Sequence, residues 1–360
     1  MPGIPKNWVR FIDGTHPDLP ALSLAALLQF LNARNQKRAT YSRPEENPAR
    51  KLMRDAVTCP EDNRKSIQQL ERSGSVAVIA SIDPDVLGGG FCQFLKCLTA
   101  AKVAEKLSEN SIDAVAVCWI HSQPVHDTCM HQTLRLLDPD RKLHQFQSRI
   151  VPCSSDNHTS VHFYDGAAEL PVAIEALGRG SFDSGVLASL HTACGRQDSE
   201  NSGLARLLDD LMHAWNIIVM DSRTPGLRTA LEKKCVSVFD NVKERDGGNL
   251  NKFLSTASVD YLMQTLIFPR VLSVIDPCDM APFLEARNVM EAYSGFPPLV
   301  WPAISATVVD VDSRRTLEKY RLSIPDLFAG EAKLMETLRA RIPVSSAGEC
   351  DALPRLRWHV

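Results

Sequence analysis

The chain has 360 residues, enough for one large α/β domain or two smaller ones with a substantial core. Its formal net charge of -3 at pH 7 is nearly balanced, so charge gives no reason to expect nucleic acid or an acidic membrane as a partner. No stretch approaches the roughly 18 uninterrupted apolar residues of a membrane span, and no apolar signal-peptide core is evident. Ten cysteines without a CxxC motif or a paired framework favour reduced thiols. We therefore expect a cytoplasmic protein.

Residues 1–74 form a polar segment with helical patterns, which we expect to pack on the rest of the chain. An apolar helix is predicted at 22–31 and an amphipathic helix at 64–73. Between them, residues 43–48 carry two prolines and read as a loop.

The next stretch has the order of a parallel-sheet unit. An apolar run at 76–80 is followed by a turn rich in Asp, Pro and Gly at 81–90 and by a helical pattern at 91–109. A second apolar run follows at 114–120. Strand, loop, crossover helix and strand in this order build a parallel sheet. Ligands bind at the carboxyl edge of such sheets, so the polar loops after both strands are candidate sites.

The remaining chain continues to alternate strands and helices. We expect strands at 134–140, 146–152, 216–220 and 271–275, an extended segment at 299–309, a charged loop at 240–251, and helices at 167–177, 204–215, 226–235, 255–266, 281–293, 313–320 and 331–341. These elements predict an α/β fold: a Rossmann-like, mostly parallel sheet flanked by helices. The core is expected at 75–328, with a loose insertion around 178–202, and a C-terminal helix and tail at 329–360.

Glycines and charges in the first loop are candidate ligand contacts. Gly88, Gly89 and Gly90 precede a helix, where backbone N–H groups favour phosphate or carboxylate. A flexible turn explains them equally well, because neither GxGxxG nor GxxxxGK[ST] is present. Asp83 in the same loop would repel a phosphate unless a metal intervened.

Histidines and cysteines gather after the second apolar run. The spacing of Cys118, His121, His126, Cys129 and His131 matches no zinc pattern, so no metal site is predicted. His126 and Asp127 suit a proton-transfer or substrate-orienting pair at a strand end. A surface histidine bonded by its own loop remains the alternative.

Further polar residues follow later strands. Asp221 and Arg223 could bind ribose, carboxylate or phosphate, although an N-cap role explains Asp221 just as well. Asp279 follows the strand at 271–275. Ser305 and Thr307 alternate along the extended segment, either lining a site or as ordinary strand residues.

Several of these pieces, in this order, resemble the cysteine-adding enzymes of bacillithiol biosynthesis, the cysteine ligases. The segment 75–81, the turn 87–90 and a helix bearing Lys96 are similar to that family's strand, Gly-Gly turn and lysine-bearing helix. Cys118 to Ile120, followed by His126 and Asp127, resembles its Phe-Trp strand and EDHD loop. Other similar segments are 136–138, 217–225, 269–283, 302–307, 317–320 and 322–328.

The resemblance implies a Rossmann-like ligase that joins the carboxylate of cysteine to the amine of glucosaminyl malate, an amino-sugar malate. It further implies a bound nucleotide, ATP or ADP. His126 and Asp127 would be catalytic. The family's coiled coil is replaced here by the helix 331–341 and a polar tail, which leaves dimerisation through that element open.

Polar positions depart from the family pattern more often than apolar ones. The replaced positions are the Gly-Gln-Gln loop, now Ser81, Ile82 and Asp83; an acidic pair, now Pro124 and Val125; a Gly-Gly pair, now Ile275 and Asp276; and an arginine, now Ala303. Two hypotheses follow: an active cysteine ligase, or a non-catalytic relative that keeps the fold to bind a small molecule or a protein partner from the same pathway.

Overall fold

The computed structural model describes most of the chain, and every structural statement below concerns the described residues. These are 6–14, 16, 19, 23–38, 46–72, 74–83, 91–121, 131–137, 143–149, 151–152, 159–160, 203–222, 224–245, 256–268, 270–306, 311–327 and 330–341. They fall into two compact units. The large unit lies between Arg10 and Ser305, and the small unit draws on Met1–Val9 and Ala306–Val360.

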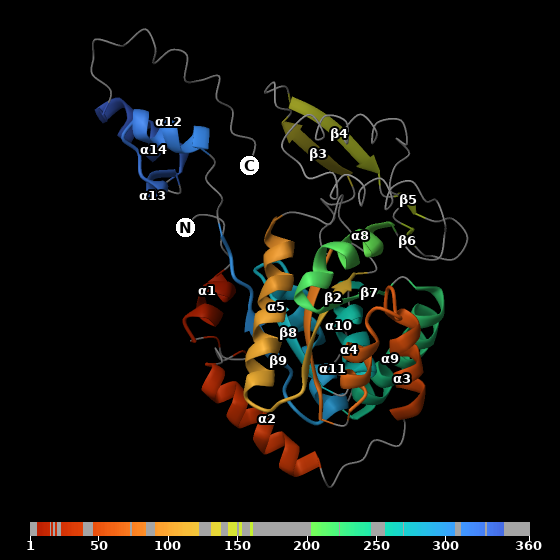
Figure 1. The fold of residues 1–360 in the computed structure, drawn as a ribbon. Helices are drawn as coiled ribbons and strands as arrows, with labels where there is room; N and C mark the ends of the chain where they lie inside the picture. Colours follow the sequence, from red (N-terminus) through yellow and green to blue (C-terminus); the bar gives the residue numbers. More distant parts are fainter. Residues whose placement is uncertain are drawn as a thin grey trace. The chain divides into compact units, whose positions relative to one another are not determined.

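A five-stranded sheet forms the centre of the large unit (Figure 1). Its strand order is β7 (Ile217–Asp221), β2 (Ala114–Ile120), β1 (Val76–Ile82), β8 (Val271–Ile275) and β9 (Leu299–Pro302). Every pairing in it is parallel. All residues of β1, β2 and β7 are buried, as expected for strands covered on both faces. The prediction of an α/β, Rossmann-like fold is confirmed.

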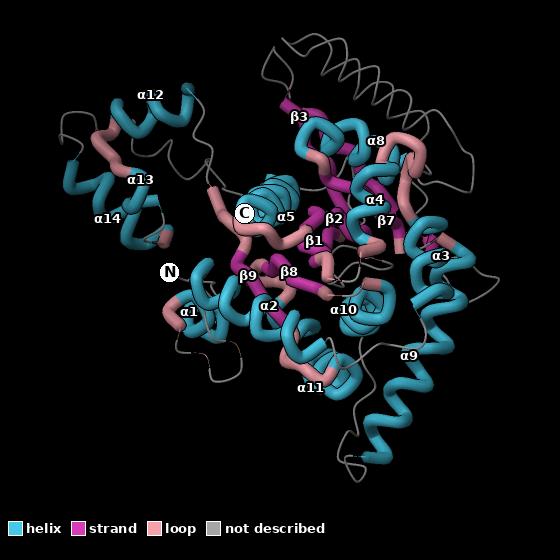
Figure 2. The backbone as a smooth tube through the Cα atoms, turned by 60° about the horizontal axis from the view of Figure 1, so that its bottom comes forward, coloured by secondary structure: helices cyan, strands magenta, loops and turns pink. Residues whose placement is uncertain are grey.

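Helices cover both faces of this sheet (Figure 2). A cluster of buried apolar residues joins one face to α2 (Leu24–Arg38), α5 (Phe91–Glu109) and α8 (Gly203–Met212). On the other face, the Trp119 ring of β2 meets Phe268, just past α10 (Thr256–Ile267), with 6.5 Å between ring centroids. Because side chains alternate along a strand, Cys118 and Trp119 point to opposite faces.

The remaining described elements lie outside the central sheet. In the large unit they are α3 (Glu46–Ala56), α4 (Arg64–Leu70), η3 (His213–Trp215), α9 (Pro225–Arg245), α11 (Met280–Ser294), and the paired strands β3 (His131–Leu137) with β4 (Leu143–Arg149) and β5 (Val151–Pro152) with β6 (Thr159–Ser160). Helix α1 is Lys6–Ile12. The small unit contains α12 (Val311–Lys319), α13 (Ile324–Leu327) and α14 (Glu331–Arg341).

Three sequence predictions need correction. The loop expected at 43–48 is wrong from Glu46 onward, because α3 begins there; its proline lies in the first turn, where a missing N–H is tolerated. The charged loop expected at 240–251 is wrong to Arg245, because α9 continues that far. The extended segment expected at 299–309 is a strand only to Pro302, and residues 303–306 belong to no strand.

Other predictions hold or lie outside the described residues. The helix at 91–109 and the strand at 114–120 have the predicted bounds. The helix expected at 167–177 and the insertion at 178–202 fall outside the described ranges. The boundaries proposed at 74 and 328 remain predictions. No described helix is both long and apolar enough to cross a membrane.

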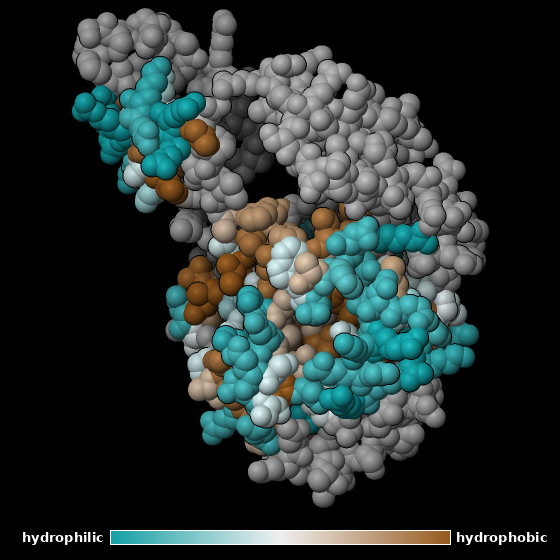
Figure 3. All heavy atoms as spheres, viewed as in Figure 1, coloured by the Kyte–Doolittle hydropathy of each residue, from teal (hydrophilic) through white to brown (hydrophobic). Residues whose placement is uncertain are grey.

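The visible surface of the large unit has both hydrophilic areas and a hydrophobic area (Figure 3). One exposed apolar group is built from aromatic rings: Phe94 lies 6.5 Å from Phe91 and 5.5 Å from Trp215, centroid to centroid. The side chains of Phe91 and Trp215 are both partly open to solvent. A pocket of about 530 Å³, which Trp215 also lines, lies among parts of α4, α5, β2 and η3 and contains none of the predicted site residues.

Candidate functional site

The carboxyl ends of β1 and β8 form the topological switch point of the sheet. From β1 the chain crosses through α5 to β2 on one side, whereas β8, reached much later, pairs with β1 on the other side. In open parallel sheets, the crevice between two such strands is the usual place for a ligand. Charged side chains gather there.

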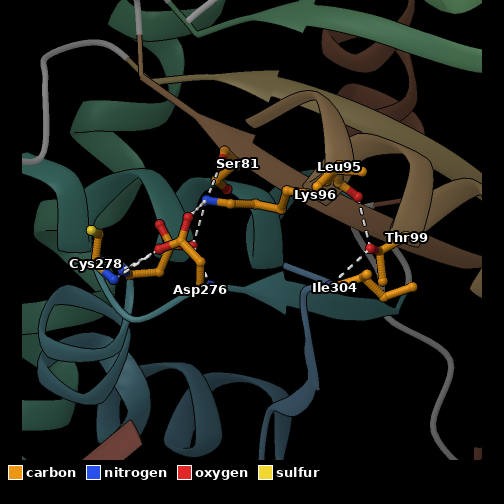
Figure 4. Close-up of polar contacts among 8 residues, drawn as sticks. Ser81, Leu95, Lys96, Thr99, Asp276, Cys278 and Ile304 are labelled. Atoms are coloured by element: carbon orange, nitrogen blue, oxygen red, sulfur yellow. Dashed lines mark hydrogen bonds and ion pairs between the residues drawn. The ribbon is translucent and has the colours of Figure 1, made fainter. Parts of the chain in front are cut away.

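Lys96 is the central cation of this group (Figure 4). Its side chain leaves α5 and is almost completely buried. The Nζ donates to the carbonyl oxygen of Ser81 at 2.8 Å and to Oδ2 of Asp279 at 2.6 Å, and lies 2.9 Å from Oδ2 of Asp276. An ammonium group has three N–H donors, so these contacts use all of them.

The loop after β8 holds both carboxylates in place. Oδ1 of Asp276 accepts hydrogen bonds from the backbone N–H groups of Cys278 and Asp279, at 2.8 and 3.2 Å. Oδ2 of Asp279 in turn accepts one from the backbone N–H of Asp276 at 3.0 Å. Asp279 is also the N-cap residue of α11. The acidic pair is therefore fixed by backbone donors as well as by Lys96.

Burial and charge act in opposite directions on these groups. Burial disfavours the Lys96 ammonium, but the charges of Asp279 and Asp276 outweigh it and raise the pKa of Lys96. Burial also raises the pKa of Asp279, whereas for the less buried Asp276 the attraction of Lys96 wins and lowers the pKa. The lysine is protonated at neutral pH, and Asp276 is its more readily ionised partner.

A histidine–aspartate pair lies beside this group, at the end of β2. Nδ1 of His121 is 3.0 Å from Oδ2 of Asp260 on α10, and both residues are fully buried. The backbone N–H of His121 donates to the carbonyl oxygen of Ile82, which ties the ends of β1 and β2 together. Burial lowers the pKa of His121, but the hydrogen bond and charge of Asp260 give a net increase, helped by Asp83 and Asp279.

Two further polar residues of α10 face the ends of β1 and β2, beside the His121–Asp260 pair. Nε2 of Gln264 donates to Oγ of Ser81 at 2.8 Å, and the ring of Tyr261 stands edge-on to that of His121, 5.8 Å between centroids. Burial strongly raises the pKa of Tyr261, and the nearby carboxylates add to the effect. The phenol therefore stays protonated at neutral pH.

The structure brings some of the predicted site residues together and separates others. Lys96 and Asp279 are in contact, and Asp83, at the end of β1, is close enough to affect the pKa of His121. Asp221 is buried at the end of β7, beyond β2 from the switch point. Ser305 is exposed beyond the end of β9. Outside the described residues lie Gly88, Gly89, Gly90, His126, Asp127, Arg223 and Thr307.

Asp221 is joined through its backbone to Thr224, the residue before α9, and its expected N-cap role stays a prediction. Its backbone carbonyl oxygen accepts hydrogen bonds from the N–H and the hydroxyl of Thr224, at 3.1 and 2.9 Å. Cys118, from the rejected metal cluster, is buried in the apolar layer between β2 and α5. The described residues contain no group of three His, Cys, Asp or Glu side chains arranged for a metal ion.

Asp260, Tyr261 and Gln264 were missed in the sequence. A signal was present: Asp260 and Gln264 are the charged and amide side chains of an otherwise uncharged, largely apolar helix, and their spacing of four places both on one side of it. Polar residues on the buried side of a helix need partners, and this requirement predicts a polar site where the helix meets the sheet.

Comparison with known proteins gives one distant similarity. No family model matches the chain. Among curated proteins, it is similar to "Putative cysteine ligase BshC" of Solibacter usitatus (strain Ellin6076), with 21% identity over 93% of this chain and 74% of the relative. The similarity extends through the sheet and its helices, and at this identity it supports a cysteine-ligase-like relationship without fixing a substrate.

Proposed function

We propose that this protein is a ligase that joins the carboxylate of cysteine to the amine of glucosaminyl malate, forming an amide. Two facts support the proposal: the similarity to a protein named as a cysteine ligase, and the charged group at the switch point of the sheet. The second carries the argument, because a purely structural α/β core has no need of buried charges at its ligand-binding edge.

The balance of charge in this group favours an amine. Among the described residues there, the carboxyl groups of Asp83, Asp260, Asp276 and Asp279 outnumber the cations Lys96 and His121. An excess of carboxylates attracts an ammonium group and repels a free phosphate. The Lys96 ammonium is committed to Asp276 and Asp279, so this lysine does not supply a charge for a nucleotide.

The other half of the reaction is assigned to the loops after β1, β2 and β7. A carboxylate must be activated before an amine attacks it, and a nucleotide, ATP, would supply that activation. The backbone at Gly88, Gly89 and Gly90 and the side chain of Arg223 are proposed to hold the carboxylate or phosphate. His126 and Asp127 are proposed to orient the amine or transfer its proton.

The test is direct. Purified protein is given cysteine, glucosaminyl malate and Mg-ATP, and the amide product is measured by mass spectrometry beside an active cysteine ligase. We expect product, and a rate lowered by His126→Ala but unchanged by His213→Ala, a substitution at an exposed position of η3. Absence of product from a folded protein, with the control ligase active, contradicts the proposal.

One observation favours the second hypothesis, a non-catalytic relative. The contacts of Lys96 satisfy all its donors within the protein, as in a group whose role is to fix the ends of β1 and β8. Calorimetric titration with ADP, cysteine and the malate glycoside separates the two. A partner subunit is supported if none of the three compounds gives heat of binding. The protein should then also co-purify with an active cysteine ligase or change the rate of that ligase.

A further inference from the structure

We infer that His121, held by Asp260, is the proton acceptor for the amine substrate, and that His126 and Asp127 then serve to orient the amine. The inference deepens the proposed function and rests on it. It concerns a residue that the resemblance to cysteine ligases does not assign, because His121 lies between the Cys118 to Ile120 strand and the His126–Asp127 pair that carry the resemblance.

The orientation of the His121 ring is fixed at two points. Its backbone N–H donates to the carbonyl oxygen of Ile82 at 2.8 Å, and Nδ1 is 3.0 Å from Oδ2 of Asp260. A carboxylate beside Nδ1 accepts its proton in a hydrogen bond, so a neutral ring carries its hydrogen on Nδ1. The lone pair is then on Nε2, the atom that accepts a proton in a general base.

The second observation concerns the other ring nitrogen of His121, Nε2. It is buried and has no hydrogen-bond partner among the described residues. A buried polar atom without a partner is destabilising, so such atoms are rare unless a ligand or water completes them. The unused acceptor lies at the carboxyl end of β2, next to the strand that ends at the switch point.

Among the described residues, three carboxyl groups act on the ring, and their charge favours a cationic ligand. Asp260 comes from α10, Asp83 from the end of β1 and Asp279 from the start of α11, and each raises the pKa of His121. The neutral Tyr261 ring packs edge-on against the imidazole. A substrate ammonium approaching Nε2 would therefore meet negative charge and an available proton acceptor together.

The proton transfer fits the ligation step. The ammonium gives one proton to Nε2, and the freed electron pair forms the C–N bond to the activated carbonyl carbon. The C–O bond to the phosphate breaks, and its electron pair leaves with the phosphate together with the second proton of the nitrogen. The products are the amide, phosphate and a His121 imidazolium stabilised by Asp260.

The pH dependence of kcat/KM tests this role. His121→Gln should lower kcat/KM by about 100-fold, the usual contribution of a general base, and remove the acidic limb of the profile. Asp260→Asn keeps the base but removes the charge that raises its pKa, so the acidic limb should move to lower pH. His213→Gln is the matched control and should change neither. An unchanged limb in Asp260→Asn, or full activity of His121→Gln, overturns the inference.

A second measurement does not depend on turnover. In protein with 15N-labelled histidine, NMR should show the neutral ring of His121 protonated on Nδ1, with a pKa above the ordinary value, and glucosaminyl malate should shift the Nε2 resonance. If wild-type protein shows this shift but makes no amide, the proposed ligation is wrong and the amine-binding site at His121 stands. If the protein makes the amide without this shift, and the His121→Gln variant is also active, the proposed ligation stands and the role of His121 is wrong.

Discussion

At the scale of single residues, the pairing of Lys96 predicts a large stability effect. Lys96→Met removes the cation that Asp276 and Asp279 share and leaves both carboxylates without their ion pair. Breaking a buried ion pair from one side typically costs about 3–5 kcal/mol, because an uncompensated charge stays in the interior. We expect a loss of this size in the free energy of unfolding, measured by urea titration.

Two further variants separate the ion pair from the volume of the side chain. Adding Asp279→Asn to Lys96→Met should recover part of the loss, because it removes one of the unpaired charges. Lys102→Met, on the same helix, removes an exposed lysine paired with Glu105 and should cost less than about 1 kcal/mol. Equal losses at Lys96 and Lys102 would refute the importance of the buried pair.

His121 predicts a dependence of stability on pH. Burial opposes the charged ring, but Asp260 outweighs it, so the pKa in the folded protein lies above the unfolded value of about 6.5. The contribution of the charged pair is complete below that unfolded value and is lost as pH rises through the higher, folded pKa. Urea midpoints of wild type and His121→Gln should therefore converge as pH rises from about 6 toward 9. A gap that widens over this range would contradict the raised pKa.

At the scale of elements, the turn between α5 and β2 offers a stabilising substitution. Ser111 has φ 62°, in the left-handed region that glycine adopts without strain, and its N–H bonds to the carbonyl oxygen of Ser108. Ser111→Gly should stabilise the protein by about 0.5–1 kcal/mol. Ser108 is exposed in the last turn of α5, and Ser108→Gly should destabilise the protein by about 0.5 kcal/mol, as glycine does in helices. Thermal unfolding of both variants gives the comparison, and loss of stability at position 111 would contradict the argument.

The central elements could be predicted from the sequence because their signals are local. The runs at 76–80 and 114–120 are apolar throughout, as buried parallel strands require, and the helix between them has clear bounds. The failures were at helix ends. Charged residues at 240–245 suggested a loop, but they continue α9 to Arg245, because a polar composition is compatible with a helix end.

The site was harder to predict, because its contacts join distant parts of the chain. Asp279 follows Lys96 by 183 positions, and Asp260 follows His121 by 139. No local pattern specifies such pairs; the strand order brings them together. Lys96 was singled out through the resemblance to cysteine ligases, and Asp279 through its place after a strand. The orientation of His121 depends on Asp260, which local patterns did not identify.

At the scale of the whole large unit, the strand order predicts where structure persists longest. β1 is hydrogen-bonded to β2 on one side and β8 on the other, and all its residues are buried, whereas β7 and β9 are the outer strands of the described sheet. Amides of a central strand exchange only when its neighbours also separate, so their protection approaches that of global unfolding.

Hydrogen exchange followed by mass spectrometry should therefore show the slowest exchange in peptides covering β1 and β2, with faster exchange in β9. The Lys96→Met variant extends the prediction, because Lys96 connects the end of β1, through Ser81, to the loop after β8. Its loss should speed exchange at the ends of β1 and β8 more than in β7, which lies beyond β2 from these contacts. A uniform increase across all the strands would mean that the ion pair stabilises the fold as a whole and does not specifically hold the switch point together.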